Sequence, residues 1–193
     1  AGNIYFIYSY VSGIQFSKIR KVNSGGTISS IYNDSSYCGP SGLALDSLDN
    51  IYFGCVSGDH VRKMTPSFVT TIFAGSGFGN GSLANNIRLN ADGMAFNTAG
   101  DLYMGFYAGS SYGRTALIKV DNTTSIVSVI GGGNEGNSGD GGAVANATFG
   151  HIMGLTFDSD GNLYLVDNFS RRVRKVNTSG TITAFAGNGN FGS

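Results

Sequence analysis

The sequence predicts an all-β fold built from four copies of one four-stranded antiparallel unit. In the clearest copy, residues 154–187, short runs rich in Val, Ile, Thr, Tyr and Phe are separated by turns rich in Gly, Asn, Asp and Ser. Runs of about five residues with this composition are typical of β-strands. They cover residues 154–158, 162–167, 172–176 and 181–186. One such meander cannot bury both of its faces, so copies of it are expected to pack beside it.

Three parts of this unit recur along the chain. The second run, at 162–165, is repeated at 3–6, 50–53 and 101–104, always with tyrosine in third place (Tyr5, Tyr52, Tyr103 and Tyr164). The basic third run, at 172–176, recurs at 18–22, at 60–64 and more weakly at 116–120, and the fourth run recurs at 69–75. Four-stranded units repeated every 40–50 residues or so, about one blade each, are typical of a β-propeller.

The recurring motifs divide one domain, residues 1–193, into four repeats. These are expected at about 1–39, 40–90, 91–151 and 152–193. Because residues 1–3 correspond to the turn before a second strand, the first blade is predicted to lack its inner strand. An incomplete ring leaves two blade faces uncovered. We therefore expect the chain to belong to a longer polypeptide or to an assembly with copies of itself, and closure of the ring with four blades is the alternative.

The order of the motifs resembles that of NHL-repeat β-propellers. The pattern Asp-x-x-Gly-Asn-Leu-Tyr, then Arg-x-Arg-Lys-Val, then Gly-x-Ile-Thr-x-x-Ala-Gly is matched nearly in full by residues 154–187. The loop at 138–143 is also similar to loops of the bacterial and teneurin-like members. The resemblance extends over the whole chain and is strongest in the second and fourth repeats. It implies rigid blades whose loops supply the contacts to a partner.

Composition narrows the classes of function. The formal net charge is zero and only 12% of residues are charged, which argues against a nucleic-acid partner. No apolar segment approaches the roughly 18 residues of a membrane helix, so no membrane span is predicted. The low charge also leaves few groups to solvate the surface, so glycans or neighbouring chains are expected to cover part of it.

The resemblance bears on catalysis. Propeller enzymes such as lactonases and lyases place several carboxylates or histidines around the central channel. The equivalent positions here, at the ends of the second strands, are Tyr8, Cys55, Phe106 and Asp167. One carboxylate in four favours a non-catalytic protein. Asp167 and His151, which precedes an inner strand on the same side, remain the candidates for an acid–base pair.

For the acidic loop and for the basic third strands, a structural role is predicted in place of ligand binding. Asp140, with Glu135 nearby, is the best acidic loop candidate for a cation, but calcium needs six to eight converging oxygens, so we predict no metal and no cofactor. The arginines and lysines of the third strands are expected to pack their stems between blades and to keep their charged heads in solvent.

Two features suggest an oxidising compartment. Cys38 and Cys55 lie at adjoining ends of a predicted hairpin, which favours a disulfide over a pair of buried free thiols. Six Asn-x-Ser/Thr sequons fall in predicted turns or loops and are candidates for glycosylation. They are Asn33, Asn80, Asn122, Asn146, Asn168 and Asn177.

A partner is expected to bind at two insertions rich in Tyr, Ser and Gly, at residues 9–16 and 106–113. The candidate binding residues are Tyr10, Phe16, Tyr107 and Tyr112. The alternative is that these side chains pack over the edges of the blades. The sequence thus favours a secreted, extracellular or cell-surface module (periplasmic in a bacterium) that binds a protein or a glycan and assembles with copies of itself. The alternative is a lactonase- or lyase-like hydrolase with a metal at the central channel.

Overall fold

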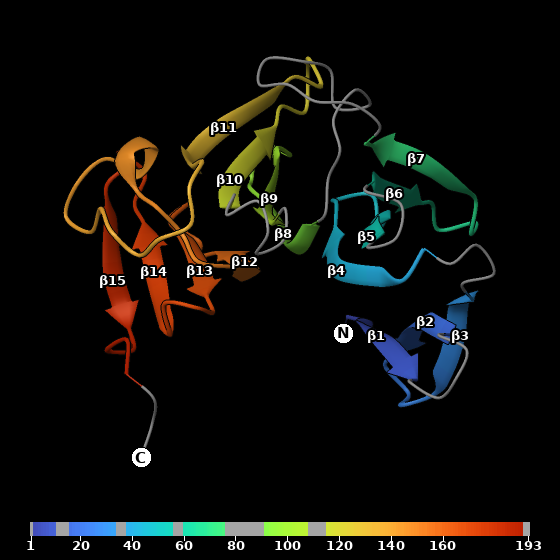
Figure 1. Ribbon diagram of the computed structural model, residues 1–193. Coiled ribbons are helices and arrows are strands. Elements are labelled where there is room, and N and C mark those ends of the chain that lie inside the picture. The colour runs from blue at the N-terminus through green and yellow to red at the C-terminus, as the bar shows by residue number, and fades with distance from the viewer. Residues whose placement is uncertain are drawn as a thin grey trace.

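The structure, a computed structural model, describes residues 2–10, 16–33, 38–55, 60–75, 91–107 and 115–190. It consists of four antiparallel sheets that follow one another along an arc as the blades of a β-propeller (Figure 1). The all-β propeller prediction is therefore confirmed. The first sheet has three strands, as expected for a blade without its inner strand, and the other three have four each.

Each sheet is a meander in which the strands pair in chain order. The first contains β1 (Ile4–Tyr10), β2 (Phe16–Val22) and β3 (Ile28–Asn33). The second contains β4 (Pro40–Leu45), β5 (Ile51–Cys55), β6 (His60–Met64) and β7 (Thr70–Ala74). The third contains β8 (Ala91–Phe96), β9 (Leu102–Tyr107), β10 (Thr115–Val120) and β11 (Val127–Gly132). The fourth contains β12 (Ile152–Phe157), β13 (Leu163–Asp167), β14 (Arg172–Val176) and β15 (Ile182–Ala186).

Strands β4, β8 and β12 lie on the inner side of the arc, and β7, β11 and β15 lie toward its outside (Figure 1). A short 3₁₀ turn, η2 (Val144–Asn146), interrupts the loop between the third and fourth sheets. Among the described residues, no helix is long and apolar enough to cross a membrane.

A carboxylate fastens the first turn of the second and fourth sheets. Asp46 accepts hydrogen bonds from the backbone N–H of Leu48 and of Asn50, from the Asn50 side chain and from the Tyr52 hydroxyl, at 2.7–3.1 Å. Burial alone would raise the pKa of Asp46, but these bonds hold it below its usual value. Asp158 is bound in the same way, with Asn162 and Tyr164 among its donors. The recurring Asp, Asn and Tyr are therefore one hydrogen-bonded unit.

The recurring lysine packs on the recurring tyrosine. The two residues are cross-strand partners in all four sheets, so their side chains share one face. Lys63 Nζ lies 5.4 Å from the centre of the Tyr52 ring, Lys175 Nζ lies 5.3 Å from that of Tyr164, and Lys21 Nζ lies 5.9 Å from that of Tyr5. These are cation–π distances. The recurring spacing between this tyrosine and this lysine therefore reflects their pairing across neighbouring strands.

The core lies between the sheets rather than within any one of them. Phe53 and Met64 are buried against the first sheet, and Leu165 is buried against the third. Tyr52 meets Phe73 of its own sheet and Phe96 of the next edge-on, both at 4.9 Å between ring centres. Each sheet therefore completes the core of its neighbour, as expected for a meander that cannot bury both of its faces alone.

Glycines in the second strands allow adjacent sheets to approach closely. A Cβ atom on Gly54 would lie 2.4 Å from the carbonyl oxygen of Ala91, and one on Gly105 would lie 2.5 Å from that of Ile152. Both oxygens belong to the inner strand region of the following sheet. The equivalent residue of the fourth sheet is Val166, which is exposed. Side chains are thus excluded from this position in the second and third sheets, whereas the first sheet has Ile7 there, packed against the second sheet.

We expect Gly105→Ala to destabilise the chain by about 1–3 kcal/mol, because backbone atoms at Ile152 cannot move aside without parting two sheets. In an open strand the same change would be neutral or stabilising, since alanine reduces the entropy of the unfolded chain. Urea unfolding followed by circular dichroism measures the difference. Val166→Ala, at the same place in the exposed fourth sheet, is the control and should change stability by no more than about 0.5 kcal/mol.

Candidate functional site

The side chains of His151 and Asp92 meet where the third and fourth sheets adjoin. Asp92 lies in β8, at an irregularity of the β8–β9 pairing, and His151 immediately precedes β12. The Nε2 atom of His151 lies 2.6 Å from the Oδ2 atom of Asp92, and both side chains are mostly buried. This distance is typical of a hydrogen bond strengthened by charge. The carboxylate therefore fixes the orientation of the imidazole ring.

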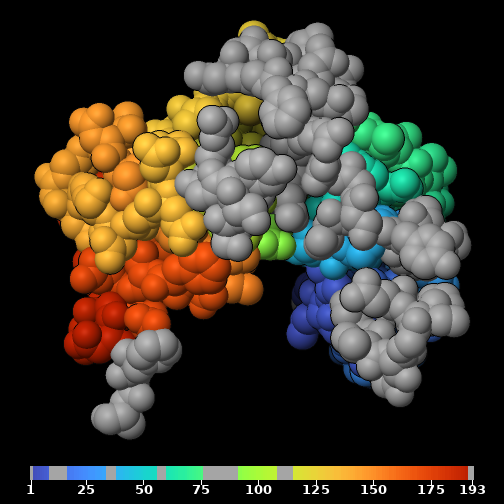
Figure 2. Space-filling view, in the orientation of Figure 1, coloured from blue at the N-terminus to red at the C-terminus, as the bar shows by residue number. Residues whose placement is uncertain are grey.

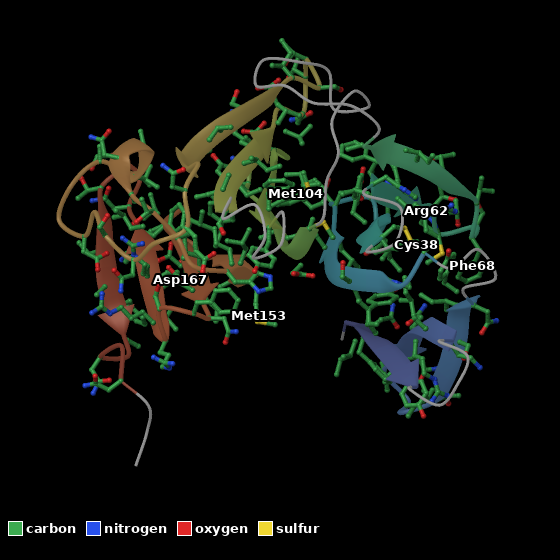
Figure 3. The ribbon with its side chains drawn as sticks, viewed as in Figure 1. Cys38, Arg62, Phe68, Met104, Met153 and Asp167 are labelled. Carbon is green, nitrogen blue, oxygen red and sulfur yellow. A yellow bond between two sulfur atoms is a disulfide. The ribbon has the colours of Figure 1, made fainter. Side chains whose placement is uncertain are left out.

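The backbone around His151 is held by three hydrogen bonds. The Gly150 N–H donates to Asp167 Oδ1 at 2.9 Å, and the Thr115 hydroxyl donates to the Gly150 carbonyl at 2.6 Å. The Asn168 N–H donates to the His151 carbonyl at 2.9 Å. Asp167, which ends β13 (Figure 3), is wholly buried. The structure thus does not pair the side chains of Asp167 and His151. Asp167 holds the segment that carries His151, and the carboxylate beside the imidazole is that of Asp92.

Two aromatic rings flank the imidazole. The ring of Tyr107, at the end of β9, stacks on that of His151 with 4.3 Å between centres and an angle of 23° between planes. Phe169, in the turn after β13, lies edge-on to both rings at 5.5 and 5.8 Å. The Phe169 side chain is 45% exposed. The group defined by Asp92, Tyr107, His151 and Phe169, called the histidine cluster below, therefore offers an apolar surface beside an oriented polar group.

Arg174 departs from the expectation that the basic heads of the third strands are solvated. Its side chain is completely buried. Its guanidinium group donates to Asp140 Oδ1 at 2.9 Å and to the carbonyl oxygens of Thr148 and Ser138 at 2.8 and 2.9 Å. It also lies over the ring of Phe149. The inter-sheet loop at 133–150 folds over the arginine and supplies these acceptors, which removes the need for water.

The cysteine and aspartate side chains named from the sequence are engaged by other groups of the protein. Cys55 is bonded to Cys38, and Asp167 binds Gly150 and lies 3.8 Å from Arg174 Nη1. Asp140 is bound to Arg174, and its other oxygen lies 3.7 Å from Arg172. Over the ranges that the structure describes, no three Cys, His, Asp or Glu side chains are placed to share an ion. Asp140 is thus engaged by two arginines. Asp167 accepts a hydrogen bond through one oxygen only, and its other oxygen, which accepts none, faces Arg174.

The remaining residues proposed from the sequence fall in different places. Cys38 and Cys55 form a disulfide across β4 and β5, with 4.7 Å between their Cα atoms. Tyr112 and Asn80 lie outside the described residues, as do the side chains of Tyr10 and Phe16. Glu135 lies in the loop after β11, where it forms a bridge to Phe149. The other five sequon asparagines are exposed, and they are Asn33, Asn122, Asn146, Asn168 and Asn177.

Sequence reasoning identified two members of the histidine cluster, His151 and Tyr107, and missed Asp92 and Phe169. A signal was present for Asp92. The residue before the inner-strand glycine is Ser41 in the second sheet, Asp92 in the third and Met153 in the fourth. A charged residue at that place in an otherwise apolar inner strand needs a partner. Phe169 carries no such signal, because single apolar residues are common in turns.

Comparison with known proteins shows the fold alone. No family model and no curated protein matches the chain. A Bacteroides thetaiotaomicron protein of unknown function has a TM-score of 0.70 and 21% identity, covering 96% of this chain and 45% of its own. A chain of a nidogen/laminin complex has a TM-score of 0.66 and 16% identity over 96% of this chain and 60% of its own. A streptogramin B lyase has a TM-score of 0.53 and 17% identity over 92% and 53%.

The solved structures that the chain resembles are β-propellers, and they include both enzymes and proteins that are not described as enzymes. The chain spans 45–60% of the length of the three named above. At these identities the function of a neighbour cannot be transferred to this chain. Its function depends on the chemistry of its own site, the histidine cluster.

Proposed function

We propose that the chain is part of an NHL-type β-propeller that acts as a binding module rather than as an enzyme, and that its ligand, a protein or a glycan, contacts the histidine cluster. The observation that carries this proposal is the half-exposed ring of Phe169 beside the stacked rings of His151 and Tyr107. Aromatic side chains with a polar neighbour are enriched where proteins recognise partners.

The rigidity of the cluster supports binding. His151 is fixed by Asp92 through its side chain and by Asn168 through its backbone. A surface that is ordered before the ligand arrives loses little conformational entropy on binding. The disulfide between Cys38 and Cys55 supports an extracellular or periplasmic location, because such bonds persist in oxidising compartments. Glycosylation at the exposed sequon asparagines belongs to the same proposal.

A glycan array and a panel of extracellular matrix proteins, probed with the purified chain, test this function. We expect Phe169→Ala to lower the affinity for any ligand found in this way about tenfold or more, as the loss of a hot-spot aromatic residue does. Phe185→Ala is the matched control, because Phe185 is also an exposed phenylalanine of the fourth sheet but packs on Tyr164 instead. Binding that is insensitive to Phe169, or lost equally in both variants, would refute the proposal.

One observation favours a second candidate, a lactonase- or lyase-like enzyme. A carboxylate 2.6 Å from an imidazole is the arrangement that orients a histidine for acid–base catalysis. In that case His151 would exchange a proton with the substrate, and Asp92 would orient it. Turnover of a panel of lactones that disappears in His151→Ala, and falls strongly in Asp92→Asn, would establish the enzyme and exclude the binding module.

A further inference from the structure

A hollow of about 450 Å³ lies among the hairpin turns of the second and third sheets. In Figure 2 the first sheet (blue) and the fourth sheet (orange and red) form the two ends of the arc, and the second and third sheets lie between them. Both walls of the hollow are therefore four-stranded sheets. Leu102, which lines the hollow, begins β9, whereas Tyr107 of the histidine cluster ends the same strand. The hollow and the histidine cluster thus lie at opposite ends of the strands.

The buried part of the lining is aromatic and aliphatic. Phe73 of the second sheet and Phe96 of the third both lie edge-on to Tyr52, at 4.9 Å between ring centres. Leu48, in the first turn of the second sheet, also lines the hollow, and its side chain is 74% exposed. A concave site of this volume with an apolar base and polar groups above it is typical of small-molecule binding.

The exposed part of the lining is polar and comes from three turns. The residues Ser47, Thr98 and Ser125 are exposed there, and within the described part of the chain their hydroxyl groups have no hydrogen-bond partner. A hydroxyl group can both donate and accept a hydrogen bond. The hollow therefore offers donors and acceptors next to apolar surface. Two amide side chains also line it, those of Asn97 and Asn122.

The charges at the hollow are already paired. Asp46 accepts four hydrogen bonds from its own hairpin, and Lys63 Nζ lies 4.0 Å from its Oδ2 atom. Asp121 accepts three hydrogen bonds from its own turn through Oδ1, and its Oδ2 atom lies 3.7 Å from Lys119 Nζ. A charged ligand would have to compete with these pairs, whereas an uncharged polar ligand would not. The arrangement of charges thus favours an uncharged ligand.

We propose that this hollow binds an uncharged mono- or disaccharide. The aromatic and aliphatic side chains contact the C–H groups of the sugar ring, and the hydroxyl and amide groups of the turns bind the sugar hydroxyls. Each sugar hydroxyl donates and accepts, as the serine and threonine hydroxyls of the lining do. Because the site lies at the other end of the strands from the histidine cluster, it does not depend on the function proposed above.

Titration of the purified chain with free sugars, followed by NMR of the methyl groups, tests the proposal. The probes are glucose, galactose, mannose, N-acetylglucosamine, lactose and maltose. We expect at least one of them to bind with a Kd of about 10 mM or below and to shift the methyl signals of Leu48 and Ala99, which line the hollow. The uronic acid and the 2-amino sugar of the same hexose should bind about tenfold more weakly, because each carries a charge.

Variants of the lining hydroxyls locate the bound sugar. Ser47→Ala, Thr98→Ala and Ser125→Gly should each lower the affinity roughly three- to tenfold, as expected for the loss of one hydrogen bond. Glycine is chosen at position 125 because Ser125 has a φ of 56°. Ser159→Ala is the matched control, since Ser159 follows Asp158 in the fourth sheet as Ser47 follows Asp46 in the second. It should leave the affinity unchanged.

Three results would overturn the proposal. The first is that none of the six sugars binds with a Kd of about 10 mM or below. The second is that the charged analogues bind as tightly as the uncharged sugar. The third is that Phe169→Ala weakens binding while the three hydroxyl variants do not, which would place the sugar at the histidine cluster instead.

Discussion

Replacing Arg174 with alanine is expected to lower the free energy of unfolding by about 3–5 kcal/mol, a large part of the stability of an ordinary domain. The substitution removes a buried cation and the three hydrogen bonds that it donates. The Asp140 carboxylate and the Thr148 carbonyl lose that donor, and the Ser138 carbonyl keeps only the Thr148 N–H at 3.2 Å. It also leaves the buried Asp167 carboxylate without the charge 3.8 Å away. Asp167 is wholly buried and adds most to the cost, whereas Asp140 and Ser138 belong to exposed residues and can bond to water instead.

Arg62→Ala is the matched control for this prediction. Arg62 (Figure 3) holds the same place in β6 that Arg174 holds in β14. It pairs with Phe53 as Arg174 pairs with Leu165. Arg62 is only half-buried, and its Nε atom donates to His60. We expect its loss to cost about 1 kcal/mol, a typical value for one hydrogen bond. Equal urea midpoints for the two variants would contradict the structural account of Arg174.

Much of the fold was predictable because it rests on local chemistry. In the second and fourth sheets, the Asp, Asn and Tyr of the first hairpin are close in sequence, and their mutual hydrogen bonds act within a few residues. The lysine that packs on the tyrosine follows from the pairing of neighbouring strands. Strand periodicity and turn composition report such short-range contacts, so the number and order of strands could be read from the sequence.

The histidine cluster could be predicted only in part, because its members come from different repeats. Asp92 and His151 are separated by 59 residues, and their contact depends on how closely two sheets approach. The repeat pattern places both residues near inner strands but does not say which carboxylate reaches the imidazole. Asp167, the obvious candidate, turns instead to the Gly150 N–H. Sequence reasoning thus identified the region and misjudged the partner.

Arg62 is half-buried and Arg174 is completely buried, and contacts between distant parts of the chain again explain the difference. Both belong to the basic run of a third strand, and the run alone predicts packed stems with solvated heads. The loop at 133–150 decides the outcome for Arg174, since it brings carbonyl groups and Asp140 over the guanidinium. Long loops carry no periodic signal, so their contacts with a blade are not apparent before the fold is known.

Reduction of the Cys38–Cys55 disulfide is expected to cost about 3 kcal/mol of stability. The bond closes a segment of 17 residues, and cross-linking a loop of this size removes a corresponding amount of entropy from the unfolded chain. Both cysteines are buried, with exposures of 3% and 0%, so the folded state protects the bond. Urea unfolding with and without dithiothreitol should show a lower midpoint in the reduced chain.

The double variant Cys38→Ala with Cys55→Ala separates the cross-link from the packing of the sulfur atoms. It loses both, so it should be less stable than the reduced wild-type chain by a further 1 kcal/mol or so for the space left in a packed core. Its midpoint should not respond to dithiothreitol. If the reductant leaves the wild-type midpoint unchanged, then the β4–β5 hairpin is held by its own hydrogen bonds and packing, and the disulfide adds nothing to the stability of the second sheet.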